Sequence, residues 1–390
     1  MFFAEELNVQ TIKFKMKKLT VKLFSLVALV AAINLTSCSD DDPAPIVPGE
    51  DQVIIDLEAG TMKGTLEEDY TLDSSVNYNL TGQFIIADGA TLNIPAGTRI
   101  LADEGGTDVY LAVLKGGKIN INGTASSPVI MSSLNGEPGD WGGLTICGNA
   151  TTTAGVDATA EVGGFIYGGT DDADNSGSIR YLQINGTGAQ INSESQYNGV
   201  SFYAVGSDTF IDNIAVINGD DDGVEFFGGT VSVSNLYLEN ASDDAIDWTE
   251  GWNGTVTNAY ISHTVAGFST AFEGDKDNGN PKFTNITSVS TVGGIALQFK
   301  KQSGGTITNL SLSGYDVDLD MKDGGDTANV IFNDGLTPVA ITDPTNPETE
   351  GQYFYALNAS VVPTVDIADF DWVNSDISFE DNVLQGAVTG

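Results

Sequence analysis

The feature that most constrains the fold is a strand pattern that recurs along residues 210–312. Each copy alternates apolar and polar residues around a central asparagine, and Gly, Asp and Asn gather between the copies. The central residues are Asn213, Asn235, Asn258, Asn285 and Asn309, which lie 22, 23, 27 and 24 positions apart. Strands repeating at this interval predict an all-β fold, a parallel β-helix (solenoid) with coils of about 22–27 residues.

The repeated asparagines are expected to be structural. Neighbouring coils of such a fold lie about 4.8 Å apart, so equivalent side chains become vertical neighbours. An asparagine can donate its amide to one neighbour and accept from the other, which satisfies polar groups where the chain bends. We therefore predict that these five side chains form a ladder and take no part in chemistry.

A second strand type alternates with the first. Two of its positions are apolar and should fill the core, and the residue between them should point outward because strand side chains alternate. The inward rows are Val200, Val224, Ile246, Phe272, Leu297 and Leu319, followed by Phe202, Phe226, Trp248, Gly274, Phe299 and Met321. The outward row is Ser201, Glu225, Asp247, Glu273, Gln298 and Asp320.

The outward row brings three carboxylates onto consecutive coils, and acidic turns precede two of its strands. Like charges about 5 Å apart repel by roughly 1–3.5 kcal/mol. The row is therefore a solvated face screened by water and salt, a site for Ca²⁺, which takes six to eight oxygen ligands, or an acid–base pair for glycoside cleavage. The candidate metal ligands are Asp221, Asp222, Glu225, Asp243, Asp244 and Asp247. The candidate catalytic residues are Asp222, Glu225, Asp244 and Asp247.

Other residues favour binding over catalysis. The only histidine, His263, lies on an asparagine strand, and the only arginines, Arg99 and Arg180, lie outside the acidic coils. A lyase would lack its usual base there. Trp252 follows a turn glycine. If its ring is exposed it would stack on a sugar, and the alternative is packing against the next turn.

Residues 51–390 are predicted to form one domain. Residues 61–80 are expected to cap the first coil, because an uncovered solenoid end exposes strand edges. Residues 335–390 lose the repeat and carry five aromatic residues, so a closing layer is expected there. Those aromatic residues are Tyr353, Phe354, Tyr355, Phe370 and Trp372.

The N-terminal segment has the layout of an export signal. In residues 16–37, two lysines precede an apolar run that ends at Ile33, and small residues follow. The run is too short to span a bilayer. Leu35-Thr36-Ser37-Cys38 matches a bacterial lipobox, which predicts acylation of Cys38 and attachment to a membrane. Residues 1–15 are interpreted as a start assigned too early, and residues 38–50 as an acidic, proline-containing tether.

The charge of the chain limits its partners. It has 15 Lys and Arg against 54 Asp and Glu, a formal net charge of −39. Such a chain disfavours nucleic acid and anionic lipid bound through a basic patch, and favours cations or polar ligands such as glycans. With Cys38 acylated, Cys147 has no partner, and its apolar neighbours predict a buried, inert thiol.

Several segments resemble a family of Bacteroidetes surface lipoproteins. They are the lipobox with its acidic tail, TLNIPAGTRI, GTASSPVIMSS, PGDWGGL, GDDDGVEFFGGTV and DDAIDWTEGWNGTV. The resemblance covers nearly all of residues 38–390. It implies a right-handed parallel β-helix, lipid-anchored at the outer membrane and exposed on the cell surface, with no agreed activity. Members are often labelled transporters, a label that the residues here do not support.

Together these observations predict a binding or adhesion module for a glycan or another extracellular ligand, with Ca²⁺ as a candidate cofactor. The alternative is a carbohydrate-active β-helix enzyme, a polysaccharide hydrolase or lyase that uses the acidic residues of one face.

Overall fold

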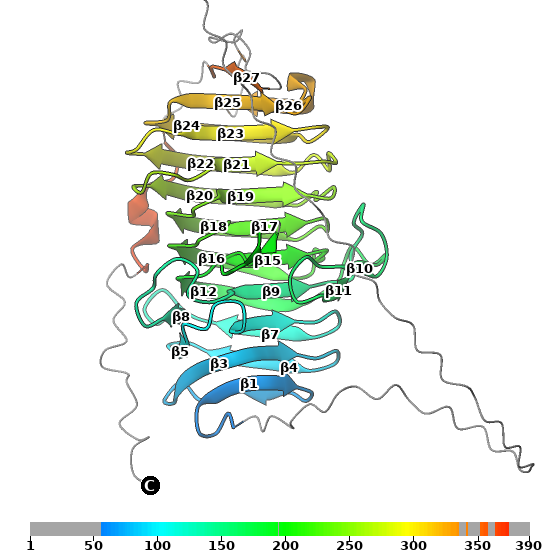
Figure 1. The fold of residues 1–390 in the computed structure, drawn as a ribbon, viewed down its shortest axis with the longest axis vertical. Coiled ribbons are helices and arrows are strands. Elements are labelled where there is room, and N and C mark those ends of the chain that lie inside the picture. Colours follow the sequence, from blue (N-terminus) through cyan, green and yellow to red (C-terminus); the bar gives the residue numbers. More distant parts are fainter. Residues whose placement is uncertain (1–55, 194, 335–340, 342–351, 358–362, 374–390) are drawn as a thin grey trace, which may run out of the picture. The chain divides into compact units, whose positions relative to one another are not determined.

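The computed structural model describes residues 56–193, 195–334, 341, 352–357 and 363–373. Over these residues the chain winds into stacked coils whose strands pair in parallel with the coil before and the coil after (Figure 1). Equivalent residues of the later coils are 22 to 27 positions apart, from Ile211 paired with Val233 to Val256 paired with Phe283. The parallel β-helix and its coil length are as predicted.

Each coil has three faces. The long strands, which include the asparagine strands, are bent, and each long strand contributes to two faces. The first four residues of β12 (Gly177–Asn185) pair with β7 (Lys118–Asn122), and its last four pair with β8 (Val129–Ser133). The second strand type supplies the third face, as in β17 (Val224–Phe227).

The first face consists of β2 (Tyr70–Thr71), β4 (Thr91–Pro95), β7, the first halves of β12, β16 (Phe210–Ile217), β18 (Ser232–Glu239), β20 (Thr255–His263), β22 (Lys282–Ser290) and β24 (Gly305–Ser313), and then β26 (Val330–Asn333). The second face contains β5 (Arg99–Ala102), β8 and the second halves of the same long strands. The third face contains β6 (Tyr110–Val113), β9 (Leu144–Cys147), β15 (Val200–Tyr203), β17, β19 (Asp244–Thr249), β21 (Thr270–Gly274), β23 (Ile295–Lys300) and β25 (Val317–Lys322).

The bend in the later long strands is made by one residue with left-handed backbone. Asn213, Asn235, Asn258, Asn285 and Asn309 all have φ between 56° and 60°. Asparagine tolerates this conformation better than most residues because its short amide bonds locally. Three successive side chains also bond along the stack: Nδ2 of Asn258, Asn285 and Asn309 donates to Oδ1 of the preceding ladder asparagine at 2.9–3.0 Å. Asn235 donates instead to Oδ1 of Asp212, at 2.8 Å. The side-chain ladder therefore runs from Asn235 to Asn309, and the prediction that Asn213 belongs to it is wrong, because Asn213 shares only the bend.

Both inward rows of the third face are in register, as predicted. Val224 pairs with Ile246, and Phe226 with Trp248. The rings stack through the core, with the centroids of Phe202 and Phe226 5.2 Å apart. In the next coil, Gly274 occupies the position that pairs with Trp248. A Cβ at residue 274 would lie 2.7 Å from Cζ2 of the Trp248 ring. The glycine therefore leaves the volume that the indole fills.

The two ends differ from expectation. Residues 61–80 do not form a separate cap, because β1 (Thr61–Leu66) pairs in parallel with β3 (Asn77–Ile86) and so belongs to the first coil. Of the predicted closing layer, β27 (Gln352–Tyr355) does pair antiparallel with β25. The described residues 363–373, with η2 (Ile367–Phe370), instead pack on the side of the stack, where Trp372 meets Tyr181 edge-on.

The remaining elements lie outside the regular coils. They are the hairpin of β10 (Ala158–Thr159) and β11 (Ile166–Tyr167), the hairpin of β13 (Gln190–Asn192) and β14 (Ser195–Gln196), and the 3-10 turn η1 (Thr327–Asn329). The first hairpin belongs to an excursion of residues 149–176 between β9 and β12, and the second to a loop of residues 186–199.

Candidate functional site

The outward residues of the third face form a continuous column. Ser201, Glu225 and Asp247 pair in consecutive coils, and the column continues to Asp320. The predicted solvated face is wrong for most of these side chains: the exposed fractions are 8 % for Glu225, 6 % for Glu273 and 0 % for Asp320. The column is therefore an interior feature, and its charges lack the screening that bulk water would give.

Two irregular segments flank the column near Glu225. The excursion 149–176 follows the turns at the end of the third face, with Thr152 and Tyr167 donating to Oε2 of Glu250 at 2.7 and 2.8 Å. On the other side, the loop 186–199 brings Asn198 onto Glu225, with Nδ2 2.6 Å from Oε2. The aromatic and small side chains of these segments pack on the face as a second apolar cluster. No periodic sequence signal marks either segment as a cover.

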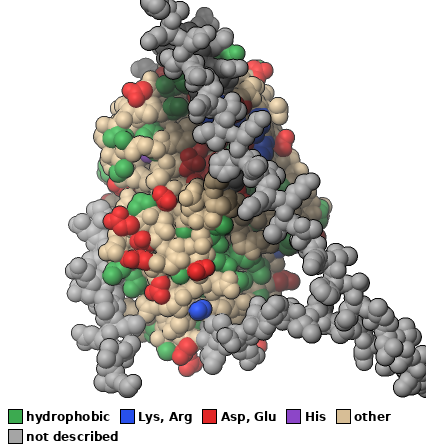
Figure 2. Space-filling model, in the orientation of Figure 1, with side chains coloured by type: hydrophobic (Ala, Val, Ile, Leu, Met, Phe, Trp, Pro, Cys, Tyr) green, Lys and Arg blue, Asp and Glu red, His purple; other side chains and the backbone are tan. Residues whose placement is uncertain are grey.

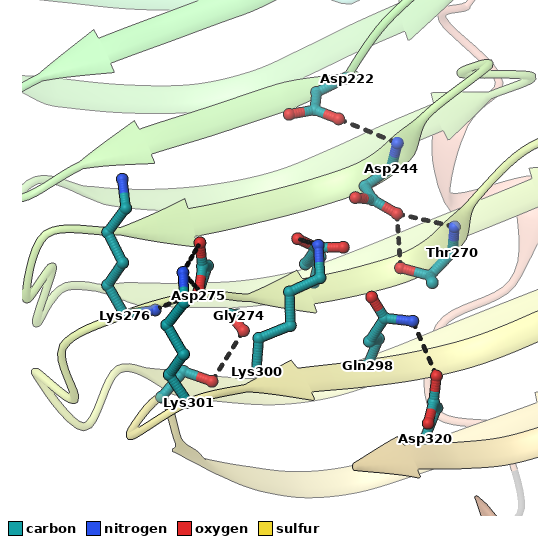
Figure 3. Close-up of polar contacts among 12 residues, drawn as sticks. Asp222, Asp244, Thr270, Gly274, Asp275, Lys276, Gln298, Lys300, Lys301 and Asp320 are labelled. Carbon is teal, nitrogen blue, oxygen red and sulfur yellow. Dashed lines mark hydrogen bonds and ion pairs between the residues drawn. The ribbon is translucent and has the colours of Figure 1, made fainter. Parts of the chain in front are cut away.

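Two of the candidate acids also hold the corner between coils. Oδ1 of Asp222 accepts from the backbone N–H of Asp244 at 2.9 Å. One coil later, Oδ1 of Asp244 accepts from the N–H and the hydroxyl of Thr270, at 2.7 and 2.6 Å (Figure 3). Each of these carboxylates thus has a structural bond through Oδ1, and its Oδ2 is the atom left to face the column.

All six predicted metal ligands come together in overlapping groups. Within each group, one carboxylate oxygen per residue lies within 4.8 Å of the others. The groups are Asp221, Asp222 and Asp243, then Asp222, Glu225 and Asp247, then Asp244, Asp247 and Glu273. The sequence pattern places Glu273 in the outward row without marking it as a ligand, although its position in that row was the available signal.

Burial and mutual repulsion disfavour the charged forms of these acids. Burial is the largest cause that raises the pKa of Asp222, Glu225, Asp244 and Asp247 well above the ordinary range. Burial and the neighbouring Asp243 raise the pKa of Asp221 to about 8. On the face drawn in Figure 2, acidic side chains (red) outnumber basic ones (blue). Because burial raises the pKa values of these acids, the cluster retains protons near neutral pH when no cation is bound.

Among the described residues, the ion pairs between lysines and the acids near the column lie at one end of it. Nζ of Lys300 forms an ion pair with Glu273, while Lys301 pairs with Asp275 at 3.0 Å (Figure 3). Beyond this point the column becomes less charged, with Gln298 donating to Oδ2 of Asp320 at 2.8 Å. Among the described residues, Asp222, Glu225 and Asp247 therefore have no ion-pair partner.

Two oxygens at that position lack hydrogen-bond partners among the described residues. They are Oδ1 of Asp247 and the amide oxygen of Asn198, whose side chain is only 1 % exposed. Burying an acceptor without a partner costs about 1–3 kcal/mol. Carboxylate and amide oxygens are the ligands that Ca²⁺ uses. The residues present therefore fit a hard divalent cation.

The predicted sugar platform at Trp252 is wrong. Its ring is fully buried and stacks on Phe226 with centroids 4.0 Å apart. Its Nε1 donates to the backbone oxygen of Val231 at 3.0 Å. Gly254 permits this, because a Cβ there would lie 2.6 Å from that Nε1. Trp252 is consequently a core residue.

Cys147 and His263 lie apart from the acidic groups in the described structure. Cys147 is buried, and burial raises the pKa of its thiol to about 12. His263 stacks on Phe268 with ring centroids 3.7 Å apart. Burial lowers its pKa to about 4, so the imidazole is neutral at physiological pH. Cys38 and the predicted signal and tether fall outside the described residues.

Comparison with known proteins agrees with this architecture. The family model described as a pectate-lyase-like beta helix domain matches residues 64–364. Among curated proteins none matches the chain significantly. Among the described residues, no helix is long and apolar enough to cross a membrane.

Proposed function

The chain belongs to the family of pectate-lyase-like β-helix domains, and from this premise we propose that it is a Ca²⁺-dependent binding module for an extracellular glycan. The carrying observation is the buried group of Asp222, Glu225 and Asp247, which has carboxylate oxygens within 4.8 Å of one another. A divalent cation there would replace the retained protons and give Asn198 a partner.

The same observation argues against direct contact between these acids and a sugar. With 8 % of Glu225 and 2 % of Asp244 exposed, the covered carboxylates favour a bare ion over a pyranose ring as their direct ligand. A bare ion is much smaller. In the proposed role the cation orders the acidic coils and the flanking segments, and these segments present the polar surface that contacts the glycan.

The proposal includes the location. The lipobox at Cys38 supports a lipid anchor in the outer membrane, and the acidic tether behind it supports display at the cell surface. There the protein would meet extracellular Ca²⁺ and polysaccharide. Mass spectrometry of the membrane-extracted protein would detect the lipid on Cys38, and Cys38→Ala should release the protein from the membrane fraction.

The catalytic alternative rests on the adjacent pair of Glu225 and Asp247. A buried acid with a raised pKa beside a second carboxylate is the arrangement that glycoside hydrolysis uses. The described residues place no arginine near the pair, and Lys300 is paired with Glu273. A hydrolase or lyase is therefore the second candidate.

One experiment separates the two functions. The full chain is run through gels cast with acidic or neutral polysaccharides, in Ca²⁺ or in chelator, and the same mixtures are assayed for new reducing ends and unsaturated uronate. We expect Ca²⁺-dependent retardation without new ends, and loss of retardation in Glu225→Gln. Turnover abolished by Glu225→Gln and Asp247→Asn would replace binding with catalysis, and retardation unaffected by chelator would reject the Ca²⁺ requirement.

A further inference from the structure

Of the three acidic groups, the one that contains Asp243 includes an exposed carboxylate. The other two consist mainly of buried acids, and one side chain distinguishes them. Asp222, Glu225 and Asp247 form the first group, and Asp244, Asp247 and Glu273 form the second, so that Asp247 belongs to both. The register places the second group one coil further along the stack. By carboxylate number alone, each group could hold a cation, and a shared carboxylate commonly bridges two metal ions.

Lys300 lies at the second group. It is the last residue of β23 and reaches back to the preceding coil, where Nζ pairs with Glu273. Its positive charge also stabilises the ionised form of Asp247, and the carboxylates of Asp244 and Asp247 in turn act on Lys300. An ammonium on a flexible four-carbon stem is a compact point charge that can occupy such a position.

The first group has no equivalent lysine. One coil earlier, the position equivalent to Lys300 is Asp275, because Gly274 aligns with Phe299. An acid at that position brings no positive charge to the first group. Instead, the first group has the buried Asn198, whose Nδ2 bonds Glu225 at 2.6 Å and whose amide oxygen has no partner among the described residues.

We infer that Lys300 is a built-in cation that fills the second of two overlapping sites. The column then takes one Ca²⁺, at Asp222, Glu225 and Asp247, and Lys300 excludes another from Asp244, Asp247 and Glu273. This inference rests on the proposed Ca²⁺ site and adds the residue that sets its stoichiometry.

The test counts bound calcium per chain. Chelator-treated full-length protein is titrated with Ca²⁺ by calorimetry, and calcium is counted by atomic emission after equilibrium dialysis. We expect one ion for the wild type, two for Lys300→Gln and one for the double variant Lys300→Gln/Glu273→Gln. Lys301→Gln is the matched control. It removes the neighbouring lysine, which pairs with Asp275, and should leave one ion.

The outcomes distinguish the two proposals. No calcium on the wild type would overturn the proposed Ca²⁺ site. One ion on both the wild type and Lys300→Gln, or two on the wild type, would overturn the role of Lys300 alone. If Lys300→Gln folds only with Ca²⁺ present, it is purified and dialysed in Ca²⁺, and Lys300→Arg, which keeps the charge, should retain one ion.

Discussion

Asn258 combines a backbone requirement with two side-chain bonds. It has φ of 60°, donates to Asn235 and accepts from Asn285. Asn258→Ala would keep a β-carbon in the left-handed region without the local amide bonds that favour asparagine there, at up to about 1–2 kcal/mol relative to glycine, and would lose bonds of about 0.5–1.5 kcal/mol each. Asn258→Gly loses the same bonds without that backbone cost. We expect both to lower the urea midpoint, the alanine variant more. Equal midpoints would show that the backbone conformation contributes little.

For single residues, the sequence correctly predicted most of the features that follow from the repeat. The asparagine ladder and the inward rows follow from strand alternation at a fixed repeat. Trp252 could not be placed this way. A tryptophan after a turn glycine has no periodic neighbour, and its burial depends on the missing Cβ of Gly254 beneath the indole. The exposure of Glu225 was also mispredicted, since Asn198 and the excursion 149–176 come from earlier, non-repeating segments.

The excursion 149–176 is an element held at several points, among them the ion pair of Asp157 with Lys115 and a set of hydroxyl contacts. Tyr167 and Thr152 both donate to Oε2 of Glu250, while Thr153 donates to Asp277 at 2.7 Å. We expect Tyr167→Phe combined with Thr152→Val to speed amide hydrogen exchange within 149–176. The coils should keep their protection, because Tyr167→Phe retains the ring that packs on Tyr203 of β15, and the bonds removed end on Glu250, which follows β19. Native-state exchange read by mass spectrometry would measure both regions.

Thr153→Val is the control for that experiment, since it removes a bond at the exposed rim. It should leave exchange beyond the first residues of the excursion unchanged. Faster exchange spreading into β15 and β17 of the double variant would contradict the independence of this element from the coils. It would mean that the excursion contributes to the stability of the column itself.

The element scale also marks where sequence reasoning ended. The repeat predicted the regular strands of residues 210–312, which pair in parallel from coil to coil. It assigned residues 335–390 to a single closing layer because they lack the repeat. The described parts divide instead between an antiparallel end strand and the side-packed segment 363–373, where Thr287 donates to the backbone oxygen of Val365 at 2.7 Å. The aromatic residues of this segment indicated that it packs against the stack, but they did not indicate which surface of the stack it covers.

For the whole molecule, the acidic column links stability to pH. An acid whose pKa is raised by folding holds a proton in the folded state that the unfolded chain releases. Stability is therefore present at and below the unfolded carboxyl pKa, about 4, and is lost as pH rises through the folded pKa. The pKa of Asp221 is about 8, and burial raises that of Glu161 to about 7 despite Lys276. His263 has a pKa lowered to about 4, so its contribution to stability increases with pH, but only up to about pH 6.5.

We therefore expect the melting temperature of chelator-treated protein to fall between pH 6.5 and 8.5, a window that contains the pKa values of Asp221 and Glu161 and in which His263 is already neutral. Millimolar Ca²⁺ should flatten this dependence, because the ion binds the ionised carboxylates of the folded state only. Glu225→Gln should reduce the fall in chelator and also reduce the gain from Ca²⁺. A melting temperature that rises across this window in chelator would mean that the buried acids are already ionised and compensated, which removes the physical reason for a cation at this site.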